Sequence, residues 1–178
     1  MSSNSQDGAF RRNLIVADIV ARTGINETMI DRLVREFYGR ARRDPLIGPI
    51  FAGEVRDWEA HFTRMRDFWS SVTLMSGRYH GQPMAAHQPL PIDTVHFDRW
   101  LELFSEAARE VCPSAAAAHF IERAHRIADS LELGIVAQRG GTRSRRAQQQ
   151  PSFRARKRLS ATPDDVDVTT ETDKRYSI

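Results

Sequence analysis

Residues 57–90, DWEAHFTRMRDFWSSVTLMSGRYHGQPMAAHQPL, decide how the rest of the chain is interpreted. The first half of this stretch repeats apolar side chains at three- and four-residue spacing, which is typical of an amphipathic helix. The apolar positions are Trp58, Phe62, Met65, Phe68, Trp69 and Val72. His61 lies at the shoulder of this apolar stripe. We therefore expect the His61 imidazole to border the protein interior.

The second half of the stretch places another histidine in a short turn bounded by prolines. Gly77 is expected to end the helix, and a polar loop then leads to the sequence MAAH at residues 84–87. Pro89 and Pro91 cannot extend a helix, so the turn stops directly after His87. This turn is predicted to be rigid and to end in an imidazole.

Apolar residues at helical spacing also mark the segments on either side. Further helices are predicted at residues 11–22, from a cap at Asn26 to Pro45, from a cap at Asp93 or Thr94 to Cys112, and at residues 114–137. The link LIGPIFAGEV contains glycines and a proline that break regular structure, so we expect an apolar corner there. No segment alternates with period two and is bounded like a strand. We therefore predict an all-α fold of about five main helices plus a short one that carries His87.

Length and composition are those of one soluble domain without a membrane span. The chain has 178 residues, is 40% hydrophobic and contains no apolar run of about 18 residues. Its start, MSSNSQDGAFRRN, lacks the apolar region of a secretory signal. The single cysteine, Cys112, excludes an internal disulfide framework and fits a reducing compartment. We expect a cytoplasmic protein.

The basic charge of the chain belongs to its C-terminal tail. Residues 1–137 carry 16 arginines against 18 acidic residues, a net charge of −2, whereas residues 138–178 carry 10 basic and 5 acidic residues, a net charge of +5. The tail has few apolar residues and is predicted to be disordered. We expect a partly helical N-terminal extension at residues 1–24, a folded domain at residues 25–137, and this basic-then-acidic tail.

Two interpretations fit the polar side chains on the predicted apolar faces. Tyr38 and Trp100 join His61 and His87 there, and each can be an ordinary core or surface residue whose polar group is satisfied locally. Together they also fit a flat apolar cofactor between the long helix and the His87 turn. A haem needs an axial ligand fixed by local structure, a large apolar slot and few hydrogen-bond donors on its opposite face.

Other kinds of site find less support in the sequence. His87 has no ligand-type neighbour at the spacing of a zinc site, and the remaining histidines do not cluster in sequence: His80, His96, His119 and His125. The motif Gly-x-Ser-x-Gly is missing, and Cys112 abuts a proline at a helix end, which disfavours nucleophilic catalysis. A phosphate-cradling glycine loop is missing as well.

Four separated motifs follow one another along the predicted helices. They are REFYGRARRDPLIGPIF, DWEAHFTRMRDFWSSVTL, YHGQPMAAHQPLP and HFDRWLELF. In this order they resemble the third group of truncated haemoglobins, bacterial globins with a shortened helical sandwich. The resemblance covers roughly residues 25–135 and implies a truncated globin-like two-over-two helical sandwich around heme b and its iron. The paired-glycine motifs of the other groups are missing from the helical core, because Gly140-Gly141 lies in the tail.

The resemblance also implies roles for particular residues. His87 resembles the proximal iron ligand, Tyr38 and Trp100 the distal hydrogen-bonding pair, and His61 the distal helix histidine. The positions that wall the haem pocket match Met65, Phe68 and Trp69. Arg64 follows His61 by three residues on the helix, so it is placed to reach outward at the pocket rim. There it either pairs with a haem propionate or remains a solvated surface arginine.

The sequence alone is therefore compatible with two classes of function. The first is a haem globin that binds oxygen, nitric oxide, carbon monoxide or another diatomic ligand through hydrogen bonds from the distal pair. Nitric-oxide dioxygenase or peroxidase-like activity would extend it, with an unidentified reductase as partner, but ligand binding is favoured. The second is a non-haem helical interaction module whose basic tail contacts a polyanion or a partner protein. We do not expect nucleic acid to be the partner.

Overall fold

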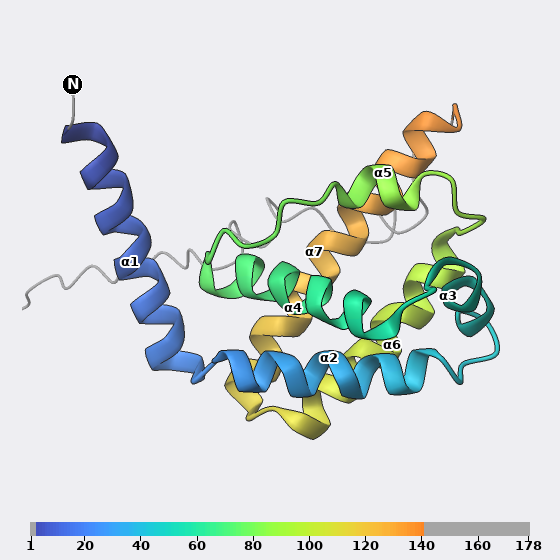
Figure 1. Cartoon of the computed structure of the whole chain (residues 1–178), viewed down its shortest axis with the longest axis horizontal. Coiled ribbons are helices and arrows are strands. Elements are labelled where there is room, and N and C mark those ends of the chain that lie inside the picture. The colour runs from blue at the N-terminus through green and yellow to red at the C-terminus, as the bar shows by residue number, and fades with distance from the viewer. Residues whose placement is uncertain (1–2, 141–178) are drawn as a thin grey trace, which may run out of the picture.

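Seven helices and no strand make up residues 3–140, the part of the chain that this computed structural model describes (Figure 1). They are α1 (Ser3–Thr23), α2 (Glu27–Ala41), α3 (Gly48–Glu54), α4 (Trp58–Leu74), α5 (Pro83–His87), α6 (Thr94–Val111) and α7 (Ser114–Gln138). The all-α prediction is confirmed. None of these helices is long and apolar enough to cross a membrane. The tail predicted to be disordered lies outside the described residues from position 141 onward.

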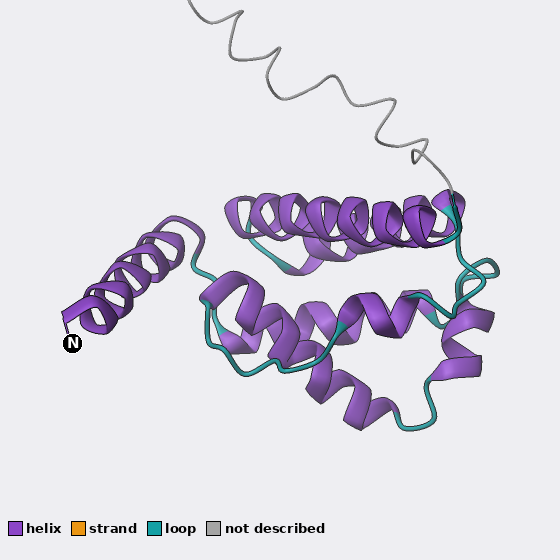
Figure 2. Ribbon diagram, turned by 90° about the horizontal axis from the view of Figure 1, so that it is seen from above, coloured by secondary structure: helices purple, strands orange, loops and turns teal. Residues whose placement is uncertain are grey.

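Two antiparallel helix pairs form the body of the domain. α2 runs alongside α4 and α6 runs alongside α7, and α2 and α6 make the main contact between the pairs (Figure 1 and Figure 2). The short helix α5 packs on α7, while α1 contacts α4 and α7. This is the two-over-two arrangement that the sequence predicts.

Aromatic side chains hold the two pairs together. Phe37, Phe104 and Phe120 are fully buried, and each such ring contributes roughly 1.5–3 kcal/mol through burial. Trp69 of α4 and Trp100 of α6 both stack on Phe104, with ring-centroid distances of 4.7 and 5.2 Å. These stacked rings fix the positions of two tryptophans relative to the same core residue.

Side-chain caps begin the helices where the sequence predicts them. The Asn26 side chain accepts a hydrogen bond from the Met29 N–H at 2.9 Å, which caps α2. Asp93 caps α6 in the same way, so the choice between Asp93 and Thr94 is resolved in favour of Asp93. His96 completes this cap by accepting a hydrogen bond from the Asp93 N–H.

The prediction of irregular structure in LIGPIFAGEV, residues 46–55, is wrong, because α3 occupies most of this stretch. Pro49 is tolerated in the first helical turn, where its missing N–H costs no hydrogen bond. Gly48 lies so close to the preceding turn that an added Cβ would come within 2.9 Å of the Arg42 carbonyl oxygen. The glycine therefore permits a tight corner and does not end the helix.

The first helix also differs from its prediction, because α1 begins at Ser3 and not at Arg11. The residues before Phe10 are polar or small, so no apolar stripe indicates a helix there. Once a helix has been nucleated, each further residue adds one backbone hydrogen bond and extension is favourable. A helix can therefore include terminal residues whose sequence pattern does not predict it.

The end of α7 is tied to the loop that follows α5. The Arg139 guanidinium donates hydrogen bonds to the carbonyl oxygens of Leu90, at 2.8 Å, and Ile92, at 2.9 Å. Arg139 lies two residues beyond Ala137, the expected end of the domain. Its side chain nevertheless satisfies backbone groups next to the turn that carries His87.

We expect a chain that ends after Gly140 to melt at the temperature of the full chain, and one that ends after Ala137 to melt several degrees lower. The two hydrogen bonds of Arg139 contribute roughly 1–3 kcal/mol together. Calorimetry of both truncated chains measures the difference, with Arg139→Met in the full chain as the matched variant. Equal melting temperatures for all of them would show that the Arg139 contact adds no stability.

Candidate functional site

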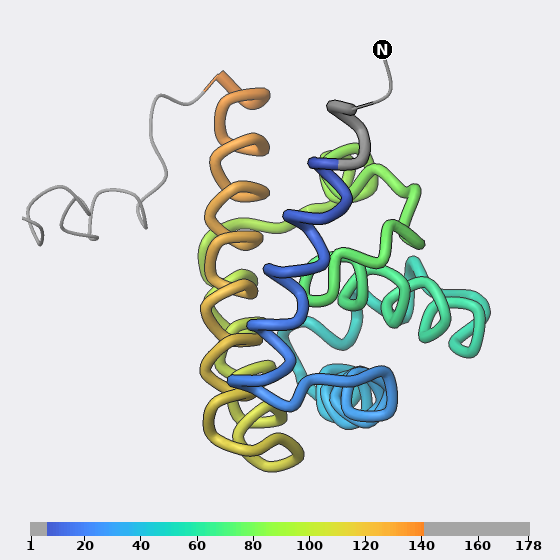
Figure 3. The backbone as a smooth tube through the Cα atoms, turned by 90° about the vertical axis from the view of Figure 1, so that its left-hand side faces the viewer, coloured from blue at the N-terminus to red at the C-terminus, as the bar shows by residue number. Residues whose placement is uncertain are grey.

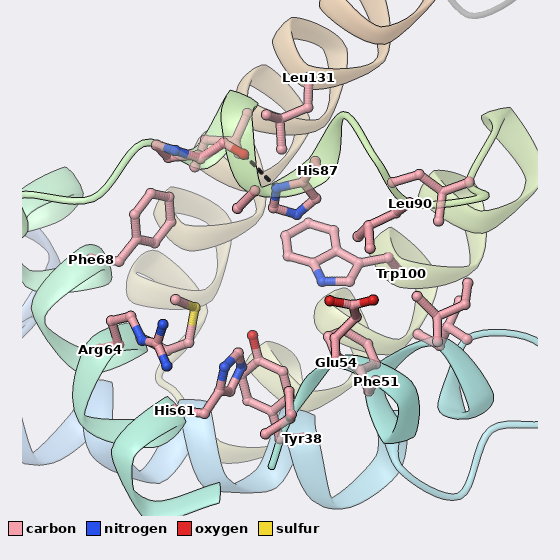
Figure 4. Close-up of a pocket in the computed structure, with 18 of the residues that line it drawn as sticks. Tyr38, Phe51, Glu54, His61, Arg64, Phe68, His87, Leu90, Trp100 and Leu131 are labelled. Atoms are coloured by element: carbon pink, nitrogen blue, oxygen red, sulfur yellow. Dashed lines mark hydrogen bonds between the residues drawn. The ribbon is translucent and has the colours of Figure 1, made fainter. Parts of the chain in front are cut away.

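A cavity of about 530 Å³ lies between α4, α5 and α6 (Figure 4). This volume is within the range of pockets that hold cofactors and small ligands. All eight candidate site residues from the sequence line it: His87, His61, Tyr38, Trp100, Met65, Phe68, Trp69 and Arg64. Helices that are far apart in the sequence thus bring these side chains around one space.

His87 enters the cavity from one side, at the end of α5. Its Nδ1 lies 2.7 Å from the Pro83 carbonyl oxygen, to which Nδ1–H donates a hydrogen bond (Figure 4). A carbonyl partner at Nδ1 fixes the tautomer that leaves the Nε2 lone pair available to a metal, and it also orients the ring. His87 therefore has the local arrangement of a metal-ligating histidine.

α5 approaches α7 closely at Gly134. A Cβ added at Gly134 of α7 would lie 2.7 Å from the Met84 Sδ, so the flexible end of the Met84 side chain would have to move if this position carried a larger residue. Met84 precedes His87 by three residues on the same short helix. The glycine therefore leaves room for the Met84 side chain where the helix that carries His87 packs on α7.

Tyr38 and His61 face the cavity from the side opposite His87 (Figure 4). Their rings meet edge to face, with centroids 4.7 Å apart and an interplanar angle of 87°. Tyr38 is only 6% exposed, and its hydroxyl points into the cavity. Burial raises the pKa of Tyr38, so the phenol keeps its proton and remains a hydrogen-bond donor.

His61 carries a polar atom that its surroundings do not satisfy. Its Nε2 is buried and has no hydrogen-bond partner within residues 3–140. Burial, reinforced by the nearby positive charge of Arg64, lowers the pKa of His61 to about 4. The imidazole is therefore neutral at pH 7. A buried polar atom without a partner is costly, so this one indicates a group that the cavity is built to receive.

Trp100 stands between these two sides of the cavity. It is half-buried on α6, and its stacking on Phe104 fixes the plane of the indole. The indole nitrogen is turned toward the half of the cavity that holds Tyr38 (Figure 4). An indole N–H can only donate a hydrogen bond, so Trp100 offers a second donor on the same side as Tyr38.

The structure adds lining residues that the sequence analysis did not select. Phe51 and Glu54 of α3, Tyr79, Leu90 and Leu131 complete the wall. Phe51 packs edge to face on Tyr38, with ring centroids 5.4 Å apart. Glu54 was missed because its segment was taken for an irregular link. In α3, the four-residue spacing from Ile50 to Glu54 places both on one helical face.

The cavity does not resemble a site for a metal ion alone. No group of three or more His, Cys, Asp or Glu side chains that could hold an ion occurs in the described part of the chain. The walls are mainly apolar. The His87 imidazole, oriented by a backbone carbonyl, stands on one side, and an unsatisfied imidazole nitrogen and a phenol stand on the other. Such a donor set fits a haem, so fold and site together define a helical haem protein.

Comparison with known proteins agrees with this class. A model of the bacterial-like globin family matches residues 20–132. The group 3 truncated hemoglobin of Campylobacter jejuni is 32% identical over 113 residues, which cover 61% of this chain and 89% of that relative. Its crystal structure superposes with a TM-score of 0.58. The truncated oxygen-avid haemoglobin of Bacillus subtilis is 25% identical, over 61% of this chain and 94% of that one, with a TM-score of 0.53.

The chain belongs to the bacterial-like globin family, and within it to the third group of truncated haemoglobins. It is thus a haem-binding globin for oxygen or another diatomic ligand. The alternative of a helical interaction module without haem is set aside. The family match leaves most of α1 outside its range, because it begins at residue 20.

Proposed function

We propose that this chain holds a b-type haem through His87 and binds a diatomic ligand on the side lined by Tyr38, His61 and Trp100. The observation that carries the proposal is the hydrogen bond from His87 Nδ1 to the Pro83 carbonyl, which leaves Nε2 directed to the cavity. When bound, the haem iron supplies the coordination position that takes the ligand. The protein supplies the orientation of His87 and the donors opposite it.

The donors on the distal side favour a ligand with negative charge on its outer atom. The Tyr38 phenol can donate to the ligand while it accepts from another group, and the Trp100 indole only donates. His61 is neutral at pH 7 and can offer either a donor or an acceptor, depending on its tautomer. Oxygen is therefore the ligand that this side is expected to stabilise most strongly.

Chemistry beyond reversible binding would use the same residues. Oxidation of nitric oxide or turnover of peroxide needs a polar distal side of this kind, together with a reductase that restores the ferrous state. We propose such a reductase as a partner and the cytoplasm as the place of action. The single cysteine, Cys112, leaves the chain without an internal disulfide, which fits a reducing environment.

Absorption spectroscopy of the ferrous protein tests the proposed ligand binding. We expect the deoxy spectrum to change when oxygen or carbon monoxide is added and to return when the gas is removed. A five-coordinate deoxy form would indicate that His61 leaves the sixth position open, and a six-coordinate low-spin form would indicate internal ligation. A spectrum that neither gas changes would contradict a ligand-binding role.

The pKa of His61 predicts how ligand entry depends on pH. Because the folded-state pKa is lowered to about 4, His61 stays neutral from high pH down to well below its usual titration range. We expect the association rate of carbon monoxide to be constant from about pH 8 to about pH 5.5 and to change only as the pH approaches 4. Flash photolysis measures this rate, and the change should vanish in His61→Gln. An inflection near pH 6.5 would show that His61 is solvated.

Arg64 is expected to have a small effect on haem retention. It is exposed at the cavity rim, where a guanidinium can pair with a haem propionate. Exposed pairs contribute about 0–1 kcal/mol, so Arg64→Ala should speed haem loss only a fewfold at low salt. Transfer of haem to a scavenger protein measures the rate, with Arg126→Ala on α7 as the control outside the cavity. An unchanged rate of haem loss in Arg64→Ala would show that Arg64 does not contribute to haem binding.

A further inference from the structure

α1 carries an apolar face that the globin domain does not cover. Ile19 and Thr23 are 4% and 8% exposed where α1 packs on the body, whereas Phe10 and Leu14 are 65% and 56% exposed. The N-terminal half of the helix extends away from the other helices (Figure 1 and Figure 2), and Figure 3 shows α1 from this outer side. An exposed phenylalanine and leucine one helical turn apart indicate a surface for an interaction partner.

Four of the exposed apolar side chains form a narrow stripe with coiled-coil spacing, and two others, Ile15 and Val20, lie outside it with 48% and 40% exposure. With about 100° per residue, the stripe lies opposite Ile19 and consists of Phe10, Leu14, Ala17 and Ala21. Steps of four, three and four residues are those of the a and d positions in a heptad. Large side chains occupy the first half of the stripe and alanines the second half.

This order of sizes fits a second copy of the same helix in antiparallel orientation. When two stripes are aligned with opposite directions, Phe10 faces Ala21 of the second copy and Leu14 faces Ala17 of the second copy. Every layer then pairs a large side chain with a small one, which favours close packing. In a parallel pair, the two phenylalanines would face each other and the alanines would leave the other end poorly packed.

Charges beside the stripe favour the same orientation. Arg11 and Asp18 follow Phe10 and Ala17 by one residue, so both lie on one flank of the stripe. In an antiparallel pair, this flank of one helix faces the same flank of the second copy, so Arg11 comes opposite Asp18 of the second copy. The two-fold symmetry of the pair produces this contact twice. In a parallel pair this flank would meet the uncharged flank that carries Asn13 and Val20.

The ion pair that Asp18 already makes within α1 does not prevent this contact. Its ion pair with Arg22, at 2.8 Å, is exposed, with side chains 61% and 63% accessible. An exposed pair between neighbouring turns contributes little, so Asp18 can share its carboxylate with a second guanidinium. The 21-residue helix is also about 30 Å long, which leaves room for two globin domains at opposite ends of the pair.

We propose that α1 is a self-association element through which two copies of this chain pair antiparallel. The stripe is short and half of it is alanine, so the dimer is weak and depends on concentration. Sedimentation velocity of the haem-loaded full chain, under reducing conditions and over a range of concentrations, measures the equilibrium. We expect dimers to appear as the concentration rises. A sedimentation coefficient that stays monomeric at every concentration would overturn the proposal.

Matched leucine variants test the surface. Leu14→Glu places a charge at the centre of the stripe and should leave only monomers. Leu133→Glu changes an equally exposed leucine on α7, at 53% exposure, and should dimerise like the wild type. Dimers that persist in Leu14→Glu, or that disappear equally in both variants, would overturn the assignment to α1.

Charge reversal tests the orientation. Arg11→Glu and Asp18→Arg each place like charges at both predicted pairs, so each alone should dimerise severalfold more weakly. An equal mixture of the two variants restores both pairs and should dimerise as tightly as the wild type. Arg22→Met removes only the pair within the helix and should change little. A mixture no tighter than its components would exclude the antiparallel arrangement.

Discussion

Replacement of His87 by alanine is expected to remove the axial histidine from the haem and to abolish normal iron coordination. His87 is the imidazole that α5 directs into the cavity with its Nδ1 fixed by the Pro83 carbonyl. The opposite imidazole, His61, belongs to a different helix and cannot take over the same position. Absorption and resonance Raman spectra of the ferrous variant should therefore lack the signature of histidine ligation.

A nearby histidine provides the control for this variant. His80 lies in the same loop but is exposed and does not line the cavity, so His80→Ala should keep the wild-type spectra. Imidazole added to the buffer should restore ligation in His87→Ala, because the variant leaves space for a ring where the side chain was. Wild-type iron coordination in purified His87→Ala would refute the assignment of the ligand.

The second large effect is expected for oxygen release. Tyr38→Phe deletes only the phenol oxygen, and Trp100→Phe replaces an indole donor with a smaller ring that cannot donate. A hydrogen bond to a charged acceptor contributes on the order of 1.5–3 kcal/mol, which corresponds to a roughly 10- to 150-fold faster dissociation if the whole loss falls on that step. Stopped-flow measurement of oxygen release gives the change for each variant.

Carbon monoxide release separates this electrostatic effect from a change in cavity shape. Bound carbon monoxide carries much less negative charge on its outer atom, so its release should change far less in both variants. Phe62→Leu, which alters a buried ring of α4 without removing a donor, provides a packing control. Oxygen release at the wild-type rate in both Tyr38→Phe and Trp100→Phe would show that the two residues only pack in the core and do not stabilise the bound ligand.

Local patterns were sufficient to predict most of the fold. Periodic apolar residues define α2, α4, α6 and α7. Short polar side chains cap the first three of these helices, and Pro113 precedes α7. The prediction failed for α3, because a glycine followed by a proline, as at residues 48 and 49, is typical of a break between helices. In the structure, both are compatible with a first helical turn against a tight corner. That compatibility depends on the position of the Arg42 carbonyl, which no local pattern reveals.

The site residues could be selected because they lie on helical faces that point to one side. Tyr38, His61 and Trp100 each occupy or border an apolar stripe, so their meeting follows once the helices are packed. The supporting contacts could not be predicted. The approach of Met84 to Gly134 and the bonds from Arg139 to the loop join residues that lie about fifty positions apart. Such contacts arise from the tertiary arrangement and leave no periodic signal.

Titration of the haem-free full chain with haem tests the central claim, that this cavity is a haem site with one histidine ligand. The absorption of the complex should saturate at one haem per chain, and the reduced complex should show histidine ligation that is lost in His87→Ala and kept in His80→Ala. Absence of saturation at one haem per chain, or identical spectra for wild type and His87→Ala, would contradict the account.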